Sequence, residues 1–492
     1  MPDPAMIDFL RSSPAVSLDA RINDLVQPLT TALSSFIFFS VDVGGASVPL
    51  IVVWLMAGSL FFTVYLRFIN LRGFLHAVKL VWPKRSHSQA EGEVSHFQAL
   101  SVALSGTVGI GNIAGVAVTL SLGGPGATFW LIIAGLISMT TKFVECTLGV
   151  KYREIDDKGV VSGGPMYYLQ RGLARRGMPR IGRVLGIFFA ASIVVGCLGI
   201  GNMFQSNQAA AQIYTLSGGA GGALEGRNWI TGCVLALIVG LVIVGGMRRI
   251  ARIADKIVPL MIVAYVTGAL AIVLMNITRL PWAISTIATQ AFSPEGVAGG
   301  VVGVMILGFQ RAVFSNEAGL GSASIAHSAV RTSEPLTEGF VALLEPFIDT
   351  VLICTLTGLV LVLVLDQETI MGGGLAGIEL TSLAFETAIH GSSYPLSAVA
   401  FLFAFSTMIA WAYYGQRGWI YLFGRGAIKL QAFNLVFCLF IIVGATIKLG
   451  AVLDFADAII YVMALPNILG LYMMASEVRH DLNDYWARRD SS

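Results

Sequence analysis

The sequence predicts an all-α membrane protein with about eleven transmembrane helices. We expect a five-plus-five inverted repeat with two broken helices, plus one extra N-terminal helix. Of the 492 residues, 55% are apolar and only 12% are charged, whereas charged residues make up about a quarter of a typical soluble protein. Two apolar stretches, 97–120 and 299–327, are interrupted by glycine-rich segments. A bilayer tolerates such interruptions only where they are buried in protein or line a cavity.

The two interruptions share one short pattern. Residues 108–112 read Val-Gly-Ile-Gly-Asn, and residues 318–322 read Ala-Gly-Leu-Gly-Ser. Each glycine costs a helix roughly 1 kcal/mol relative to alanine, so neither segment continues a regular helix well. Glycine-interrupted spans at corresponding places in two halves of a chain indicate the binding site of a transporter.

The remaining apolar runs predict the other elements in order. Residues 21–39 mix polar and apolar positions at helical spacing, which is typical of an interfacial helix. A bilayer requires about 20 apolar residues per helix, and runs of that length predict spans at about 48–68, 97–120, 127–150, 184–215, 229–246, 256–277, 299–327, 338–365, 395–423, 428–447 and 455–476. The acidic piece 375–390 is too short to cross, so we expect a helix over one face. The predicted domains are an N-terminal tail at 1–45, a transporter domain at 46–478 and a cytoplasmic tail at 479–492.

The distribution of basic residues predicts the orientation. The loops after spans one, three, five, seven and nine contain nearly all the lysines and arginines, and 151–183 is the most basic. Because short basic loops stay in the cytoplasm, we expect the N-terminus outside and the C-terminus inside the cell membrane. Without the first span, ten spans remain, which form two sets of five. Because each set has an odd number of spans, the second set is inverted in the membrane relative to the first. The two breaks would then meet near the membrane midplane.

Other functional classes fit the composition less well. A net charge of +2 with no basic face argues against a nucleic-acid partner. The five cysteines stand singly in apolar runs without metal-binding spacing, and no nucleophile–base pair or histidine–carboxylate cluster indicates an enzyme. A channel filter normally comes from one repeated segment in a symmetric oligomer, whereas here two different breaks lie in one chain. The leading hypothesis is therefore a secondary active symporter.

Several motifs resemble the alanine/glycine:cation symporter family. The longest are residues 106–117 and 309–323, the second of which contains Ser-Asn-Glu-Ala-Gly, and shorter matches lie at 201–205, 347–350 and 403–415. The resemblance covers about 48–475 and implies a fold similar to that of the bacterial leucine transporter. It also implies sodium-driven uptake of small neutral amino acids, alanine or glycine, across a lipid bilayer. Transport of glutamine or another neutral amino acid, and coupling to protons, stay open as alternatives.

The resemblance further implies a substrate site between the two breaks. Backbone amides at Ile110 and Gly111 would bind the substrate carboxylate, because the freed N–H groups of a half-helix favour an anion. The substrate ammonium group would meet carbonyl oxygens of Thr107, Phe314, Ser315 and Glu317. Side chains lining the pocket would be Gln205, Thr407 and Trp411. Many family members have threonine in place of Ile110 and often asparagine in place of Trp411, so this chain departs from the pattern in the side-chain part of the pocket.

A sodium site beside the first break is implied in the same way. Its ligands would be the carbonyl oxygens of Ser105, Val108 and Phe403 with the hydroxyls of Ser406 and Thr407. Hard oxygen donors suit a small, hard cation.

Charged residues inside the predicted spans are functional candidates by default. We favour a functional role for Glu317, whereas Arg311 would either function in transport or hold helix positions. Lys142 and Glu145 lie one turn apart and are expected to form an ion pair. Three further titratable residues, for which a structural role and a proton path both stay open, are His327, Glu345 and Asp349.

Overall fold

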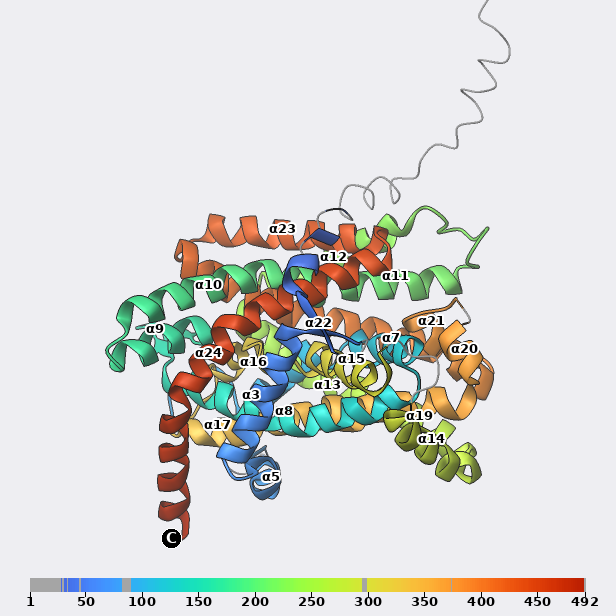
Figure 1. The fold of residues 1–492 in the computed structure, drawn as a ribbon. Coiled ribbons are helices and arrows are strands. Elements are labelled where there is room, and N and C mark those ends of the chain that lie inside the picture. The colour runs from blue at the N-terminus through green and yellow to red at the C-terminus, as the bar shows by residue number, and fades with distance from the viewer. Residues whose placement is uncertain are drawn as a thin grey trace, which may run out of the picture.

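The computed structural model describes residues 34–43, 46–81, 90–293, 299–372 and 374–490, together with 28, 31 and 32. Helices dominate this part of the chain (Figure 1). The strands described are two short antiparallel pairs, β1 (Ser40–Val43) with β2 (Ala46–Pro49) and β3 (Glu154–Ile155) with β4 (Val161–Ser162). The helical fold class expected from the sequence is confirmed.

The helices run through the chain in two groups separated by the second break. Those before it are α3 (Leu50–Tyr65), α4 (Ile69–Arg72), α5 (Phe74–Val81), α6 (His96–Thr107), η2 (Ile110–Asn112), α7 (Ala114–Gly123), α8 (Gly126–Lys151), α9 (Pro165–Arg175), α10 (Pro179–Leu198), η3 (Gly199–Met203), α11 (Phe204–Leu216), α12 (Asn228–Ile243), α13 (Gly246–Met275), η4 (Ile277–Arg279), α14 (Leu280–Phe292) and α15 (Gly300–Asn316). Those after it are α16 (Ser322–His327), α17 (Pro335–Ala342), α18 (Leu344–Pro346), η5 (Phe347–Cys354), α19 (Thr355–Val364), α20 (Gln367–Gly372), α21 (Ile378–Ala388), α22 (Ser393–Phe423), α23 (Ala427–Thr446) and α24 (Leu449–Asp490).

Seven helices among the described residues are long and apolar enough to cross a membrane, or eight when the bent pair α6–α7 counts as one span. Three shorter apolar helices, α3, α12 and α15, accompany them. Each range predicted as a span falls on one of these helices, and the predicted helix at 375–390 coincides with α21. The number of crossings and the inverted repeat stay predictions.

Two segments are more helical than hydropathy alone indicates. The segment between the predicted spans 256–277 and 299–327 contains α14, whose residues Ala283, Ile287 and Ala291 recur every four positions and are buried. The last helix, α24, continues to Asp490, whereas the apolar run ends near residue 476. Its added turns are held by Lys151, which pairs with Glu477 at 2.7 Å and also with Asp481. Most of the interfacial helix expected at 21–39 lies outside the described residues.

Both interruptions lie in the protein interior. Residues 101–120 and 311–330 are buried without exception. Around them, α6 packs against α13, α16 and α22, while α8 packs against α15, α16 and α17. The expectation that the glycine-rich breaks are enclosed by protein is therefore confirmed.

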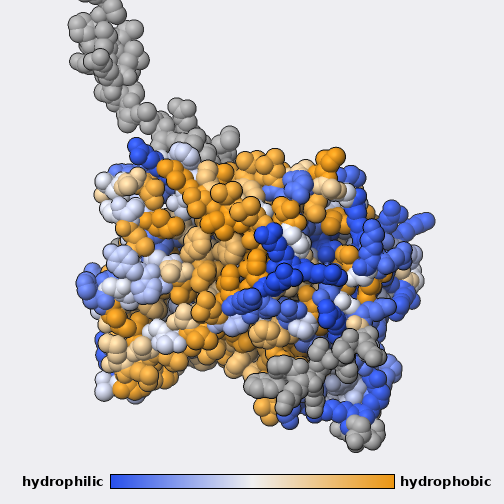
Figure 2. Space-filling view, turned by 180° about the vertical axis from the view of Figure 1, so that it is seen from behind, coloured by the Kyte–Doolittle hydropathy of each residue, from blue (hydrophilic) through white to orange (hydrophobic). Residues whose placement is uncertain are grey.

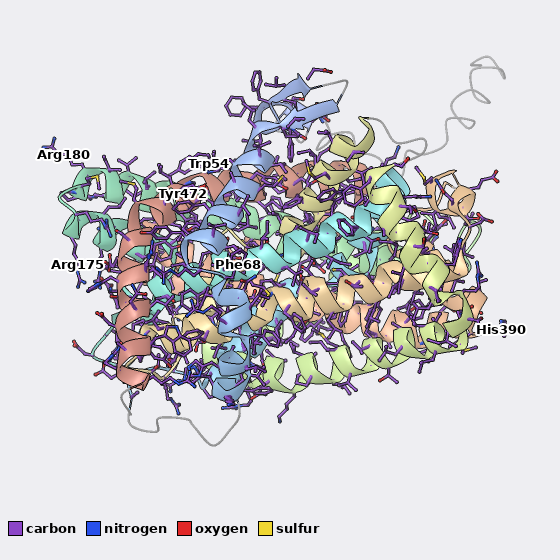
Figure 3. All side chains as sticks on the ribbon, turned by 60° about the horizontal axis from the view of Figure 1, so that its bottom comes forward. Trp54, Phe68, Arg175, Arg180, His390 and Tyr472 are labelled. Atoms are coloured by element: carbon purple, nitrogen blue, oxygen red, sulfur yellow. The ribbon has the colours of Figure 1, made fainter. Side chains whose placement is uncertain are left out.

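The surface agrees with a membrane setting. Figure 2 shows hydrophobic residues over much of one face, with hydrophilic residues gathered mainly on the right side and in a patch near the middle. In Figure 3, Arg175 and Arg180 lie at one end of the molecule and His390 lies at the opposite end. The basic segment around α9 and the segment after α21 thus occupy opposite ends, which is the arrangement that the charge count predicts.

Candidate functional site

The first break bends the chain by 60° between α6 and the η2–α7 segment. Gly109 has an extended backbone, and its amide donates to Asn112 Oδ1 at 2.9 Å. The next amide, that of Ile110, donates to Gln205 Oε1 at 3.1 Å. These two amides, which a continuous helix would bond internally, are therefore paired with side chains.

The second break turns through the left-handed region of the backbone. Gly319 and Gly321 have φ of 88° and 80°, values that suit glycine, and Glu317 adopts φ of 57° between them and α15. Asn316 Oδ1 accepts from the Ala318 amide at 3.0 Å and so supports the turn. A non-glycine residue in this conformation is uncommon and often marks a functional site.

Asn112 and Asp349 join the two breaks. Asn112 Nδ2 donates to Ser315 Oγ at 3.1 Å and to Asp349 Oδ1 at 2.5 Å. Ser315 Oγ in turn donates to Asp349 Oδ2 at 2.7 Å. Of the two roles left open for Asp349, this geometry matches hydrogen bonding to a neighbouring break. Asn112 was not among the site residues predicted from the sequence, although it is the last residue of the Val-Gly-Ile-Gly-Asn pattern at the first break.

An aromatic wall lies across from the first break. A Cβ placed on Gly111 would be 3.6 Å from Phe314 Cε1, so the ring lies directly over this glycine. The Phe314 ring meets that of Phe204 edge to face at 5.0 Å between centroids. Behind it, Arg311 pairs with Asp457 of α24 at 3.2 Å, so this guanidinium joins α15 to α24.

Trp411 lies beside the second break. Its Nε1 donates to Glu317 Oε1 at 2.9 Å, and Ser322 Oγ donates to the other carboxylate oxygen at 2.5 Å. The indole packs onto Gly201 so closely that a Cβ there would be 2.0 Å from Trp411 Cγ. Trp411 therefore fixes Glu317 and fills the space between α22 and η3.

The residues expected to bind sodium come together between α6 and α22. Ser105 Oγ donates to the Ser406 carbonyl at 2.6 Å, and Ser406 Oγ donates to the Phe403 carbonyl at 3.0 Å. The hydroxyl of Thr407 is buried and has no partner among the described residues. It lies next to the first break, since a Cβ on Gly109 would be 2.5 Å from Thr407 Oγ1. An unpaired buried oxygen beside other oxygens is a feature that a bound cation would explain.

The expected ion pair between Lys142 and Glu145 is wrong. Lys142 Nζ bonds instead to Glu345 Oε1 of α18 at 2.9 Å. Glu145 turns toward the second break, where its Oε1 accepts from the Gly321 amide at 3.1 Å and from Asn467 Nδ2 at 2.7 Å. The two side chains share a helix but serve different neighbours.

Comparison with known proteins assigns the family. The profile described as the sodium:alanine symporter family matches residues 35–492. The chain belongs to this family. It is 38% identical over 431 residues to the sodium/alanine symporter AgcS of Methanococcus maripaludis, covering 87% of this chain and 92% of that protein. The probable sodium/glutamine symporter GlnT of Bacillus subtilis is 32% identical, covering 89% of this chain and 87% of GlnT.

Another Bacillus subtilis relative, the putative sodium/proton-dependent alanine carrier protein YrbD, is 32% identical over 89% of this chain and 90% of its own. Among solved structures, that of MhsT in complex with L-phenylalanine matches with a TM-score of 0.56 at 15% identity, covering 79% of this chain and 98% of MhsT. A manganese transporter of Eremococcus coleocola matches with a TM-score of 0.52 at 14% identity, covering 79% of this chain and 83% of the transporter. This protein of the sodium:alanine symporter family therefore shares its fold with these two transporters.

Proposed function

We propose that this protein is a sodium-coupled symporter that imports small neutral amino acids, alanine and glycine, by alternating access. It would span the cell membrane several times, with the N-terminus outside and the C-terminus in the cytoplasm. The family of multi-pass symporters to which the chain belongs supports the transport class. The contact between the two buried breaks through Asn112, Ser315 and Asp349 carries the proposal.

The substrate would bind between the breaks by its backbone groups. Its carboxylate would take the amides of Ile110 and Gly111, displacing the Gln205 oxygen that now accepts from Ile110. Its ammonium group would meet the carbonyl oxygens of Thr107, Phe314, Ser315 and Glu317. Since freed amides at a half-helix attract anions and free carbonyls attract cations, two breaks suit the two ends of a zwitterion.

Sodium would bind on the other side of the first break. The donors would be Ser105, Val108, Phe403, Ser406 and Thr407, and the unpaired Thr407 hydroxyl is the observation that supports them. An ion that organises Val108 and Ser105 also organises the amides that follow them at Ile110 and Gly111. Binding of the ion and of the amino acid would therefore favour each other, as coupled transport requires.

Pocket size supports a small substrate. Phe314 covers Gly111 from one side, and Trp411 is held in place by Glu317 and Gly201. Two fixed rings leave little room beside a clamped backbone, and a clash with a rigid ring is costly. A larger neutral substrate such as glutamine is the second candidate, because a relative is named as a probable sodium/glutamine symporter.

The test is counterflow in proteoliposomes with purified full-length protein. Vesicles loaded with unlabelled alanine should take up labelled alanine when sodium is present, and unlabelled glycine should compete. Leucine and phenylalanine should not compete. Stronger competition by glutamine than by alanine would favour the second candidate, and equal uptake without sodium would contradict sodium coupling.

A further inference from the structure

A row of buried ionisable side chains, which we call the inner charge row, leads away from the second break. Figure 1 shows α16 and α17, which carry two of its members, on the same side of the molecule as α9 and the C-terminus. Its members are Lys142, Glu345, His327, Glu338 and His96. They come from α8, α18, α16, α17 and α6, respectively. The first four are 0% exposed and His96 is 6% exposed, so His96 is the member nearest to solvent.

The row is linked by hydrogen bonds except at one place. Lys142 Nζ bonds to Glu345 Oε1 at 2.9 Å, and His327 Nδ1 bonds to Glu338 Oε1 at 2.6 Å. The other oxygen of Glu338 bonds to His96 Nδ1. Between His327 Nε2 and Glu345 Oε2 the distance is 3.5 Å, and neither atom has a hydrogen-bond partner within the described part of the chain.

Counting protons explains the gap. A neutral imidazole has one N–H and one lone pair, so it donates to only one of two carboxylates. Its second nitrogen would then point a lone pair at a buried carboxylate oxygen, and an unpaired buried acceptor is costly. A ring with both nitrogens protonated donates to Glu338 and Glu345 together. The two positive charges, on Lys142 and His327, then balance the two carboxylates.

We propose that His327 is a proton-binding site, and that its imidazolium ring joins the half-helix α16 to α17 and α18. Loss of the proton to water leaves one N–H on the ring and lowers the charge of the site by one. The ring then releases one of the two carboxylates, which weakens the contact between α16 and its neighbours. Because α16 is the helix that leaves the second break, its separation from α17 and α18 would open the inner side of the carrier.

Other titratable groups lie around His327 and Glu345, on the elements packed against these two residues. Those outside the row are Glu145 and Cys146 on α8, Arg153 at its end, Tyr168 on α9, Glu317 at the break, Asp349 on η5 and Tyr414 on α22. Glu145 and Glu317 accept hydrogen bonds from Asn467 and Trp411, respectively, and not from His327. The two carboxylates that His327 faces are therefore those of Glu338 and Glu345.

The protonation state can be measured directly, since the chain has only six histidines. Purified full-length protein labelled with ¹⁵N-histidine should show one ring with both nitrogens protonated at pH 8. This signal should vanish in His327→Gln or His327→Asn, and either folded variant suffices for assignment. In Glu345→Gln the ring should become neutral, because the glutamine amide donates to Nε2. A neutral His327 in the parent protein at pH 8 would overturn the proposal.

The link to helix separation has its own test. A cysteine at Ala329, a buried position just after α16, reports opening through its rate of maleimide labelling, read by peptide mass spectrometry. The quantity measured is the labelling rate of Ala329→Cys divided by that of Ala329→Cys/Glu345→Gln. Both variants carry the same cysteine, so this ratio cancels the titration of the thiol itself. The ratio should rise by about tenfold between pH 6 and pH 9.

A ratio that stays constant with pH would overturn the coupling between this proton and α16. Neither measurement requires sodium or an amino acid. Failure of this inference is therefore distinguishable from failure of the proposed symport.

Discussion

At the scale of single residues, Thr407 provides the sharpest test of sodium coupling. Its buried hydroxyl has no partner in the described structure and lies beside Gly109. A hydrogen bond to a charged group contributes about 1.5–3 kcal/mol. If the contact of the hydroxyl with sodium is of similar strength, Thr407→Ala should raise the sodium concentration for half-maximal transport by roughly tenfold or more. Thr407→Ser keeps the hydroxyl, so its sodium concentration for half-maximal transport should stay near that of the parent protein. An unchanged dependence of transport on sodium in the alanine variant would contradict a sodium site at Thr407.

Trp411 tests the size of the pocket. Removal of the ring in Trp411→Ala should let leucine compete with labelled alanine, while alanine itself binds more weakly because Glu317 loses a donor at 2.9 Å. Trp411→Phe keeps an aromatic ring but lacks the N–H, so it should weaken alanine and still reject leucine. Competition binding on purified protein measures both. If Trp411→Ala rejects leucine as the parent does, Trp411 only packs against Gly201.

Residue patterns predicted some of the site and not the rest. The glycines of both breaks stand in local motifs, so they were visible in the sequence. The oxygen donors around Ser105 and Thr407 were expected from the family resemblance and stay a prediction. The bonds of Asn112 to Asp349 and of Lys142 to Glu345 join positions 237 and 203 residues apart. Such partners depend on how helices pack, and no local spacing encodes them.

At the scale of elements, the first break requires glycine where α22 approaches it. An added Cβ at Gly109 would be 2.5 Å from Thr407 Oγ1 and 3.0 Å from Gln205 Oε1. Overpacking of this kind costs roughly 1–3 kcal/mol, so Gly109→Ala should fold but lose most sodium-dependent alanine counterflow. The matched control is Gly115→Ala on α7, where a Cβ would meet nothing within 4 Å. Equal transport by the two variants would contradict the close approach at the first break.

Hydropathy predicted most of the helices but not all of them. Apolar runs located the helices that are buried or face lipid, including the pair bent at Gly109. They missed α14, because its 13 residues are too few to cross a bilayer. They missed the end of α24, because that part of the helix carries many charged residues. The contacts that hold the end of α24, such as that of Lys151 with Glu477, come from the end of α8, which is distant in the sequence.

At the scale of the whole molecule, the charge count predicts which ends face the cytoplasm and the outside. Arg175 and His390 lie at opposite ends in Figure 3, which is compatible with that prediction. Single cysteines at Arg175 and Ser392, in a chain without other cysteines, should label from opposite sides of the membrane in intact cells. An impermeant reagent should reach the second but not the first. Labelling of both from outside would contradict the predicted orientation and, with it, the inverted repeat.

Coupled accumulation tests the central claim most directly. Purified protein in vesicles without internal sodium receives labelled alanine and sodium outside at the same time. The account predicts that alanine rises above the external concentration and then leaks out as the sodium gradient decays, and that a sodium ionophore abolishes the rise. Uptake that never exceeds equilibrium, or that is equal with potassium in place of sodium, would contradict a sodium-driven symporter.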